Sequence, residues 1–267
     1  MSGAVSEARY IYSIVRTAEK EEAEKEDLGD IGIEKNSVFT VPYRDIAAVV
    51  HSCQPQAYET SDQKIAEEWI IEHSYVIDHS MKMFGSVLPF SFDVILKGDD
   101  RAIKQWLEKN YSVFYRNLEK IRGKAEYGVQ IYYNYDDLAG KIKEEDDVLK
   151  EMTSRVEVES KGKAYLLQKK MNQRLKSLVA QKSASLAEKS LAKISFLVEE
   201  IKIDEKKRIP DEYRDLSLLA SYACLVRDDK VSILGEMLDE INHLEGFRVR
   251  FTGPWAAFSF VDRQELS

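Results

Sequence analysis

The sequence predicts an α+β protein made of two ferredoxin-like (split βαβ) units joined by a long helical segment. Apolar segments with strand-type alternation occur toward both ends of the chain, and a charged stretch with helical periodicity lies between them. In addition, the order strand, Asp-Asp, helix, Gly, alternating strand occurs twice, around Asp99 to Tyr133 and around Leu218 to Phe251. The repeat is one of element types and not of residue identities, and it favours two units of split βαβ type.

Residues 1–135 are predicted to form the first α+β domain. Tyr10 to Val15 is apolar on both faces, which is typical of a central strand. Thr60 to Gln63 has the form of a capping box and predicts a helix that runs to about Phe84. The next strand contains Pro89, which lacks a ladder donor and places that strand at an edge or a bulge. Further strands are expected at 38–41, 46–51 and 125–133, and a further helix after Asp99.

Residues 136–211 are predicted to be a helical connector. This stretch is rich in charge and poor in aromatic residues, and its helix is expected to be interrupted near Gly162 and to end at Ile209-Pro210. Its apolar stripe is expected to include Val198 and Ile201. Residues 212–267 form the predicted C-terminal α+β unit with an aromatic tail, and together with the connector they make one C-terminal domain.

Composition and charge narrow the class of protein. The chain has 267 residues, with 39 basic and 47 acidic residues and a net charge of −8, which disfavours wrapping by nucleic acid. No apolar run approaches the roughly 20 residues of a membrane span, and Met1 to Ala8 has no apolar core of the secretory type. We therefore expect a cytoplasmic protein that binds neither nucleic acid nor a membrane.

The residues that catalysis requires do not cluster in the sequence. The four histidines and two cysteines show no metal-ligand or nucleophile spacing, and His73 and His79 turn away from each other on one helix. The chain has no glycine-rich phosphate loop. We therefore expect no enzymatic activity, no metal and no cofactor.

The helical connector carries a concentration of positive charge. Nine basic residues and one acidic residue lie between Lys161 and Lys193. One interpretation is a binding site for an acidic partner or for a phosphate backbone, and the other is the solvated face of a long helix. Tyr165 is the one aromatic residue there, so base stacking has little support. The candidate residues of the acidic-partner patch are Lys163, Lys169, Lys170, Arg174 and Lys176.

The tail begins with a Gly-Pro turn that carries an aromatic run. Gly253 and Pro254 are expected to end the preceding strand, so we predict that Trp255 folds back onto the second α+β unit and is buried there. Phe258 or Phe260 is then the more exposed residue and the expected contact for a partner protein.

Four stretches, in this order and spacing, carry a family resemblance. They are Tyr10-Ile11-Tyr12, Asp45 to Val50, the Val-Leu-Pro-Phe-Ser-Phe run of Val87 to Phe92, and the Thr-Gly-Pro-Trp-x-x-Phe-Ser-Phe run of Thr252 to Phe260. Together they resemble the GvpF/GvpL family of gas vesicle proteins. The chain departs from the family pattern at Ser91 and Asp93 and after the Trp, whereas it keeps Pro89, Phe92, Gly253, Pro254 and Trp255.

The resemblance implies a non-enzymatic accessory protein of gas vesicle formation with two ferredoxin-like domains. Its partner would be the small hydrophobic shell protein, with other accessory proteins as further partners. The residues of the family motif, Pro89, Phe92, Gly253, Pro254, Trp255, Phe258 and Phe260, would then serve structure or partner binding. The alternative is a pair of ferredoxin-like domains that bind or convert a small ligand, which rests on fold analogy.

Overall fold

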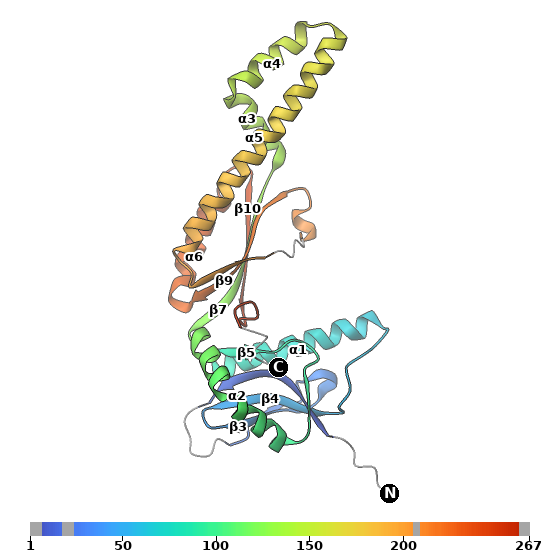
Figure 1. The fold of residues 1–267 in the computed structure, drawn as a ribbon, viewed down its shortest axis with the longest axis vertical. Coiled ribbons are helices and arrows are strands. Elements are labelled where there is room, and N and C mark those ends of the chain that lie inside the picture. Colours follow the sequence, from blue (N-terminus) through green and yellow to red (C-terminus); the bar gives the residue numbers. More distant parts are fainter. Residues whose placement is uncertain (1–6, 18–23, 205–208, 262–267) are drawn as a thin grey trace. The chain divides into compact units, whose positions relative to one another are not determined.

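The chain folds into two compact units in the computed structural model, which describes residues 7–17, 24–204 and 209–261 (Figure 1). Unit 1 combines residues up to Glu126 with the segment from Pro254 onward, and unit 2 is Tyr127–Gly253. This division differs from the expected boundaries at residues 135 and 212, because the tail joins the N-terminal unit.

The elements of unit 1 are β1 (Ala8–Arg16), β2 (Asp27–Gly29), the 3-10 helix η1 (Ile33–Lys35), β3 (Val38–Tyr43), β4 (Ile46–Cys53), α1 (Gln63–Phe84), β5 (Val87–Pro89), β6 (Ile95–Lys97) and α2 (Asp100–Ile121). The sheet has the order β2-β3-β4-β1-β5, and β6 also pairs with β1. β1 is therefore a central strand, as predicted, with β4 antiparallel on one side and β5 and β6 on the other. Pro89 lies on an edge strand, which confirms its predicted position.

Helices cover both faces of this sheet. Ala47 and Val49 of β4 share a core cluster with Val76 of α1. Successive strand residues point to opposite faces, so Ala48 and Val50 point away from α1. That second face is covered by α2, which packs against β1, β3, β4 and β5. A split βαβ unit has both helices on one face, so unit 1 departs from the ferredoxin-like expectation.

The helix starts in unit 1 are set by aspartates. The cap of α1 is Asp62, whose carboxylate accepts a hydrogen bond from the Lys64 amide, and not the predicted Thr60. Asp99 caps α2 as predicted and accepts from the amides of Arg101 and Ala102. Each carboxylate satisfies amides that the first helical turn leaves unpaired, and it lies at the positive end of the helix dipole.

The elements of unit 2 are β7 (Lys124–Tyr133, which enters from unit 1), α3 (Tyr135–Glu145), α4 (Asp147–Val158), α5 (Lys161–Ser195), β8 (Glu200–Ile203), η2 (Asp211–Tyr213), β9 (Ser217–Arg227), η3 (Asp228–Lys230), α6 (Val231–Asn242) and β10 (Phe247–Trp255). The sheet has the order β10-β7-β9-β8. Its first strand thus lies between its fourth and third strands, which is the order of a split βαβ unit.

The predicted duplication fails at β7. This strand follows α2, and its predicted alternation and burial hold from Ala125 to Val129, but it pairs in the sheet of unit 2 and not with the sheet of unit 1. The expected connector is therefore the enlarged first crossover of unit 2, built from α3, α4 and α5. The sheet that β7 joins is set by pairing with strands that are distant in the sequence, and local periodicity carries no information about such pairing.

Two further predicted element boundaries, one for a helix and one for a strand, were wrong. Ile201, predicted to belong to a helical stripe, lies in β8 and pairs with Cys224 of β9. Gly253 and Pro254 do not end the preceding strand, since β10 continues to Trp255. Proline is compatible with an edge strand, and β10 is at the edge of its sheet.

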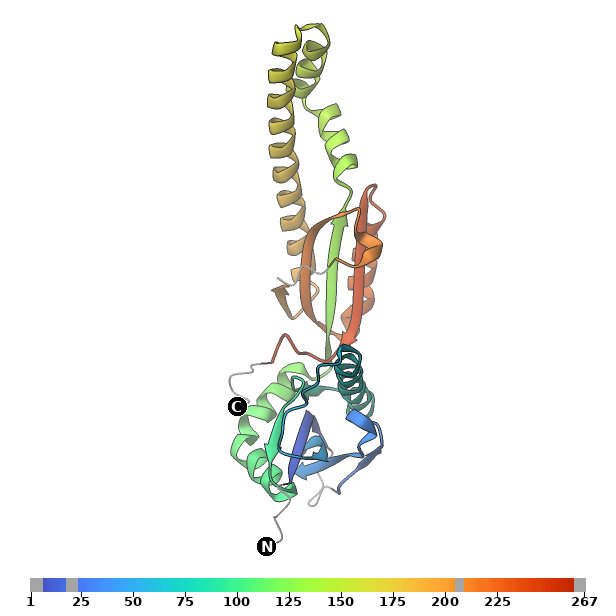
Figure 2. The same cartoon turned by 90° about the vertical axis from the view of Figure 1, so that its right-hand side faces the viewer.

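The α3–α5 hairpin is the most extended feature of unit 2, and Figure 2 shows α5 as one unbroken helix beside α3 and α4. The chain leaves the helix at Glu159 and Ser160, close to the predicted break at Gly162, and breaks a second time at Asp146. A narrow apolar seam holds the hairpin together; it contains Leu138, Ile142, Leu149, Met171, Leu175 and Val179.

Candidate partner-binding site

The family-motif tail divides into an exposed half and a buried half. Gly253, Pro254 and Trp255 are all exposed, and Trp255 keeps 48% of its surface in contact with solvent. Gly253 has a φ of 127°, a conformation that favours glycine and that sets the direction of the next two residues. The predicted burial of Trp255 on the second α+β unit is therefore wrong.

The buried half is anchored in unit 1. Ala256, Ala257 and Phe260 are 4%, 2% and 2% exposed, and Ala256 belongs to the core cluster beside β1, β4 and α1. The amide and the hydroxyl of Ser259 donate to the two carboxylate oxygens of Glu126 at 2.7 and 2.6 Å. The Lys120 ammonium donates to the carbonyl oxygen of Phe260 at 2.9 Å.

This anchoring reverses the expected roles of the tail aromatics. Phe258 or Phe260 was expected to be the more exposed contact residue, but Phe260 is a core side chain and Phe258 is partly buried against the core cluster that contains Ala256. The aromatic residue of the tail that presents a large surface to solvent is Trp255. Its position is restrained because the next residues, Ala256 and Ala257, are held in the core of unit 1.

Pro89 and Phe92, the other motif residues, belong to the interior of unit 1. Pro89 is buried in β5, and the Phe92 ring packs against the rings of Tyr10, Tyr58 and His73 at centroid distances of 5.8 to 6.3 Å. Pro89 is buried and Phe92 is partly buried, so neither presents a largely exposed side chain. The structure gives them a packing role in an aromatic cluster on the α1 side of the sheet.

Two buried histidines tie this aromatic cluster together. His73 lies 2.9 Å from the Tyr10 hydroxyl through Nδ1 and 3.2 Å from the Phe90 carbonyl through Nε2. A carbonyl can only accept, so Nε2 carries the proton and Tyr10 donates to Nδ1. The Tyr10 oxygen in turn accepts from the amide of Asp93 at 2.9 Å.

The second histidine repeats this arrangement. Tyr12 accepts from the Ile33 amide at 2.9 Å, and its hydroxyl lies 2.7 Å from His51 Nδ1, while Nε2 of His51 lies 2.9 Å from the Tyr58 hydroxyl. Burial lowers the pKa of both His51 and His73 to about 4, so both imidazoles are neutral at pH 7. A neutral, fully hydrogen-bonded pair of this kind stabilises the core and offers no open coordination position.

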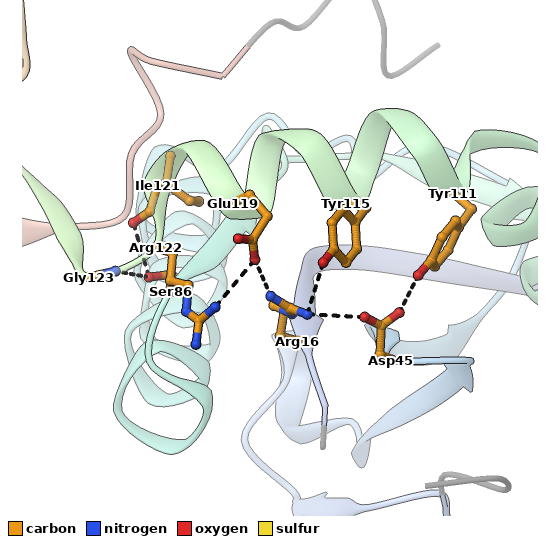
Figure 3. A network of polar contacts seen from close by, with 9 residues as sticks. All are labelled: Arg16, Asp45, Ser86, Tyr111, Tyr115, Glu119, Ile121, Arg122 and Gly123. Atoms are coloured by element: carbon orange, nitrogen blue, oxygen red, sulfur yellow. Dashed lines mark hydrogen bonds and ion pairs between the residues drawn. The ribbon is translucent and has the colours of Figure 1, made fainter. Parts of the chain in front are cut away.

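A polar network fastens α2 to the end of the sheet (Figure 3). Asp45, in the turn before β4, is 6% exposed; it accepts from the Tyr111 hydroxyl at 2.5 Å and from Arg16 at 3.1 Å. Arg16 also pairs with Glu119 and lies over the Tyr115 ring at 4.8 Å. The hydrogen bond to Asp45 raises the pKa of Tyr111 to about 12.

This network was not predicted from the sequence, although Asp45 begins the Asp45 to Val50 stretch of the family motif. A single charged residue at the end of an apolar strand was the available signal, but it does not show which partners from α2 will meet it. Because each charge in this network has a partner, we assign it a structural role, which is to hold α2 against the sheet, and not the binding of an ion. We call it the clamp between α2 and the sheet.

The predicted basic patch is only partly available. The Arg174 guanidinium donates to both oxygens of Asp146 at 3.1 and 2.7 Å, so it holds α5 to the start of α4. This pairing raises the pKa of Arg174 and lowers the pKa of Asp146. Lys163 lies 3.8 Å from Glu159, whereas Lys169, Lys170 and Lys176 are exposed. Four of the five predicted residues thus present charge to solvent.

Residues 7–17, 24–204 and 209–261 contain no group of three or more His, Cys, Asp or Glu side chains that could hold a metal ion. Within the same ranges, no helix has the length and apolar character that crossing a membrane requires.

Comparison with known proteins identifies relatives over nearly the whole chain. Residues 8–262 match the family described as gas vesicle synthesis protein GvpL/GvpF. Gas vesicle protein L1 of Halobacterium salinarum is 33% identical over 260 residues, which are 96% of this chain and 91% of that protein. Gas vesicle protein L of Haloferax mediterranei is 28% identical, over 88% of this chain and 74% of that protein. Gas vesicle protein F of the same organism is 24% identical.

The fold also resembles solved structures. The crystal structure of the gas vesicle protein GvpF from Anabaena sp. PCC7120 has a TM-score of 0.72 at 17% identity, and the match covers 96% of this chain and 99% of that one. The GvpF structure from Microcystis aeruginosa has a TM-score of 0.64 at 14% identity, with the same coverage. Both share the mixed α+β architecture with two antiparallel sheets.

Proposed function

Because the chain belongs to the GvpL/GvpF family of gas vesicle proteins, we propose that it is an accessory vesicle component that binds the small hydrophobic shell protein. A shell subunit that exposes a large apolar surface before incorporation associates non-specifically. A partner that covers part of that surface limits this aggregation and presents the subunit for nucleation and assembly. This is a binding role and requires no catalytic group.

The observation that supports this proposal most directly is the division of the tail. A tryptophan that is 48% exposed forgoes part of the free energy that burial of its ring would contribute. Pro254 before it and the buried Ala256 after it restrict its backbone, so little conformational entropy is lost when a partner binds. Tryptophan is also among the residues that dominate the energetics of protein interfaces.

The test is co-expression of this protein with the shell protein, followed by affinity capture. Trp255→Ala is expected to weaken capture of the shell protein at least about tenfold and to leave the melting temperature nearly unchanged. The matched control is Leu244→Ala, which removes a comparably exposed apolar side chain (52%) and should keep full capture. Absence of a complex with the unaltered protein, or full capture by Trp255→Ala, would contradict the proposal.

A further inference from the structure

The outer face of α1 carries two apolar residues, Ile71 and Tyr75, that the fold of unit 1 leaves largely exposed, although the Tyr75 ring stacks on His79 of the same helix. Ile71 and Tyr75 are 67% and 53% exposed and lie one helical turn apart. The buried face of the same helix is formed by residues such as His73 and Val76, so the pair points away from the core. Apolar side chains grouped at the solvent-facing side of a helix indicate a contact surface.

Acidic residues surround this pair. Glu67 and Glu68 lie one turn before Ile71, and Asp78 lies one turn after Tyr75. From residue 59 to residue 72 the chain has five acidic residues and one lysine. We call Glu67, Glu68, Ile71, Tyr75 and Asp78 the α1 patch. A partner for it must offer apolar side chains flanked by positive charge.

The first three turns of α5 offer that combination. Tyr165 and Leu166 are adjacent in the sequence, 70% and 59% exposed, and lie outside the seam that buries Met171 and Leu175. Residues 161–170 contain four lysines and no acidic residue. Lys169 lies one turn after Tyr165 and Leu166 and is exposed beside them. We call Lys163, Tyr165, Leu166, Lys169 and Lys170 the α5 patch.

We propose that the α1 patch of one copy of this protein binds the α5 patch of a second copy. Each patch has two apolar residues with charges mainly of one sign around them, and the two signs are opposite; in the α5 patch Lys163 lies 3.8 Å from Glu159, whereas Lys169 and Lys170 supply the exposed positive charge. This arrangement gives apolar burial at the centre and a complementary rim. Because the two surfaces differ, a pair of copies can form the contact twice about a two-fold axis, or the contact can repeat along a chain of copies.

The test is a charge exchange read by the mass of the complex in solution. The unaltered protein is expected to self-associate, and more weakly at high salt, since screening weakens the charged rim. Glu67→Lys with Glu68→Lys, and separately Lys169→Glu with Lys170→Glu, should each weaken self-association at least about tenfold. In an equimolar mixture of the two variants, the reversed α1 patch of one variant meets the reversed α5 patch of the other, so the charges are again opposite. The mixture should therefore associate as a complex that contains both variants.

The matched control is Lys189→Glu with Lys193→Glu, which changes the same charge on α5 outside the patch and should associate like the unaltered protein. Circular dichroism verifies that each variant remains folded. A monomeric unaltered protein, association that survives both reversals, or a variant mixture that stays monomeric would each overturn the proposal. Trp255 is not part of either patch, so a failure here leaves shell-protein binding untouched, and the reverse also holds.

Discussion

The sheet of unit 1 and the α3–α5 hairpin of unit 2 differ in how much of their surface is buried. In unit 1, β1 and β4 are buried on both faces, and several buried polar groups are paired in networks such as Asp45 with Arg16, although the buried Ser13 hydroxyl of β1 has no partner among the described residues. In the hairpin, one narrow seam is buried and most of α5 faces solvent. Unit 1 should therefore be sensitive to single changes that the hairpin tolerates.

The two regions also differ in the role of their polar and charged groups. A buried polar group must keep its hydrogen-bond partner, because the loss of one partner leaves the other desolvated and unpaired. An exposed lysine on α5 has water as its alternative partner, so its substitution costs little folding stability. The positive charge of α5 is thus available for association with other surfaces, whereas the buried polar groups of unit 1 are needed for its fold.

The largest expected effect comes from acid. His51 and His73 have a pKa of about 4 in the folded state, against 6.5 in the unfolded chain. Above pH 6.5 both states are neutral, whereas between pH 6.5 and 4 the unfolded chain binds protons that the folded chain excludes. The free energy of unfolding should therefore fall by on the order of 3 kcal/mol for each histidine by pH 4.

Urea unfolding at a series of pH values measures this loss. His73→Gln should flatten the dependence by removing one of the two titrating groups, whereas His243→Gln, which alters an exposed histidine outside the cluster, should leave it unchanged. A free energy of unfolding that stays constant from pH 6.5 to pH 4 would contradict the assignment of two buried neutral imidazoles.

The next effect concerns the tail. Phe260→Ala should reduce the free energy of unfolding by about 3–5 kcal/mol, because Phe260 is 2% exposed and the chain around it is held by Lys120 and Glu126. Phe258→Ala should cost less, since that ring is only partly buried. Thermal and denaturant unfolding would measure both, and an equal loss for the two variants would show that the tail is not anchored at Phe260.

The clamp between α2 and the sheet gives a somewhat smaller effect. Asp45→Ala removes the acceptor of Tyr111 and one partner of Arg16, and the expected cost is about 3 kcal/mol, because Arg16 keeps Glu119. A double-mutant cycle with Tyr111→Phe should show coupling between the two residues. Additive effects within 0.3–0.5 kcal/mol would argue against a shared network.

The elements that the sequence predicted best are those whose evidence is local. Tyr10 to Val15 was correctly predicted as a central strand because both of its faces are apolar, and Asp99 as a cap because the residue type and its place before an apolar stripe suffice. β8 was missed because Ile201 was assigned to the apolar stripe of a continued helix. Its pairing with Cys224 of β9, which is 23 residues later in the sequence, makes it part of a strand.

The candidate site was predicted only in part, again because some of the contacts that define it join residues distant in the sequence. The motif from Thr252 to Phe260 identified the segment, but which of its aromatics is buried depends on Glu126, Lys120 and the core that receives them. Likewise, Arg174 looked like one more member of a basic patch because its partner Asp146 is 28 residues earlier. Partners distant in sequence therefore account for the errors in both places.

The smallest expected effect distinguishes Arg174, which is ion-paired with Asp146, from the exposed Lys176 on the same helix. Arg174→Ala removes both hydrogen bonds to Asp146, which also caps α4 through the Leu149 amide at 2.8 Å. Asp146 keeps that cap in the variant, so only the connection between α4 and α5 weakens. Amide hydrogen exchange in α4 should therefore accelerate, while exchange in the sheet of unit 1 should not change.

Lys176→Ala is the matched control on the same helix, because an exposed lysine holds no such connection, and its exchange pattern should equal that of the unaltered protein. If both variants accelerated exchange in α4 equally, helix propensity or charge would be responsible and the Arg174–Asp146 pair would not be what joins the two helices.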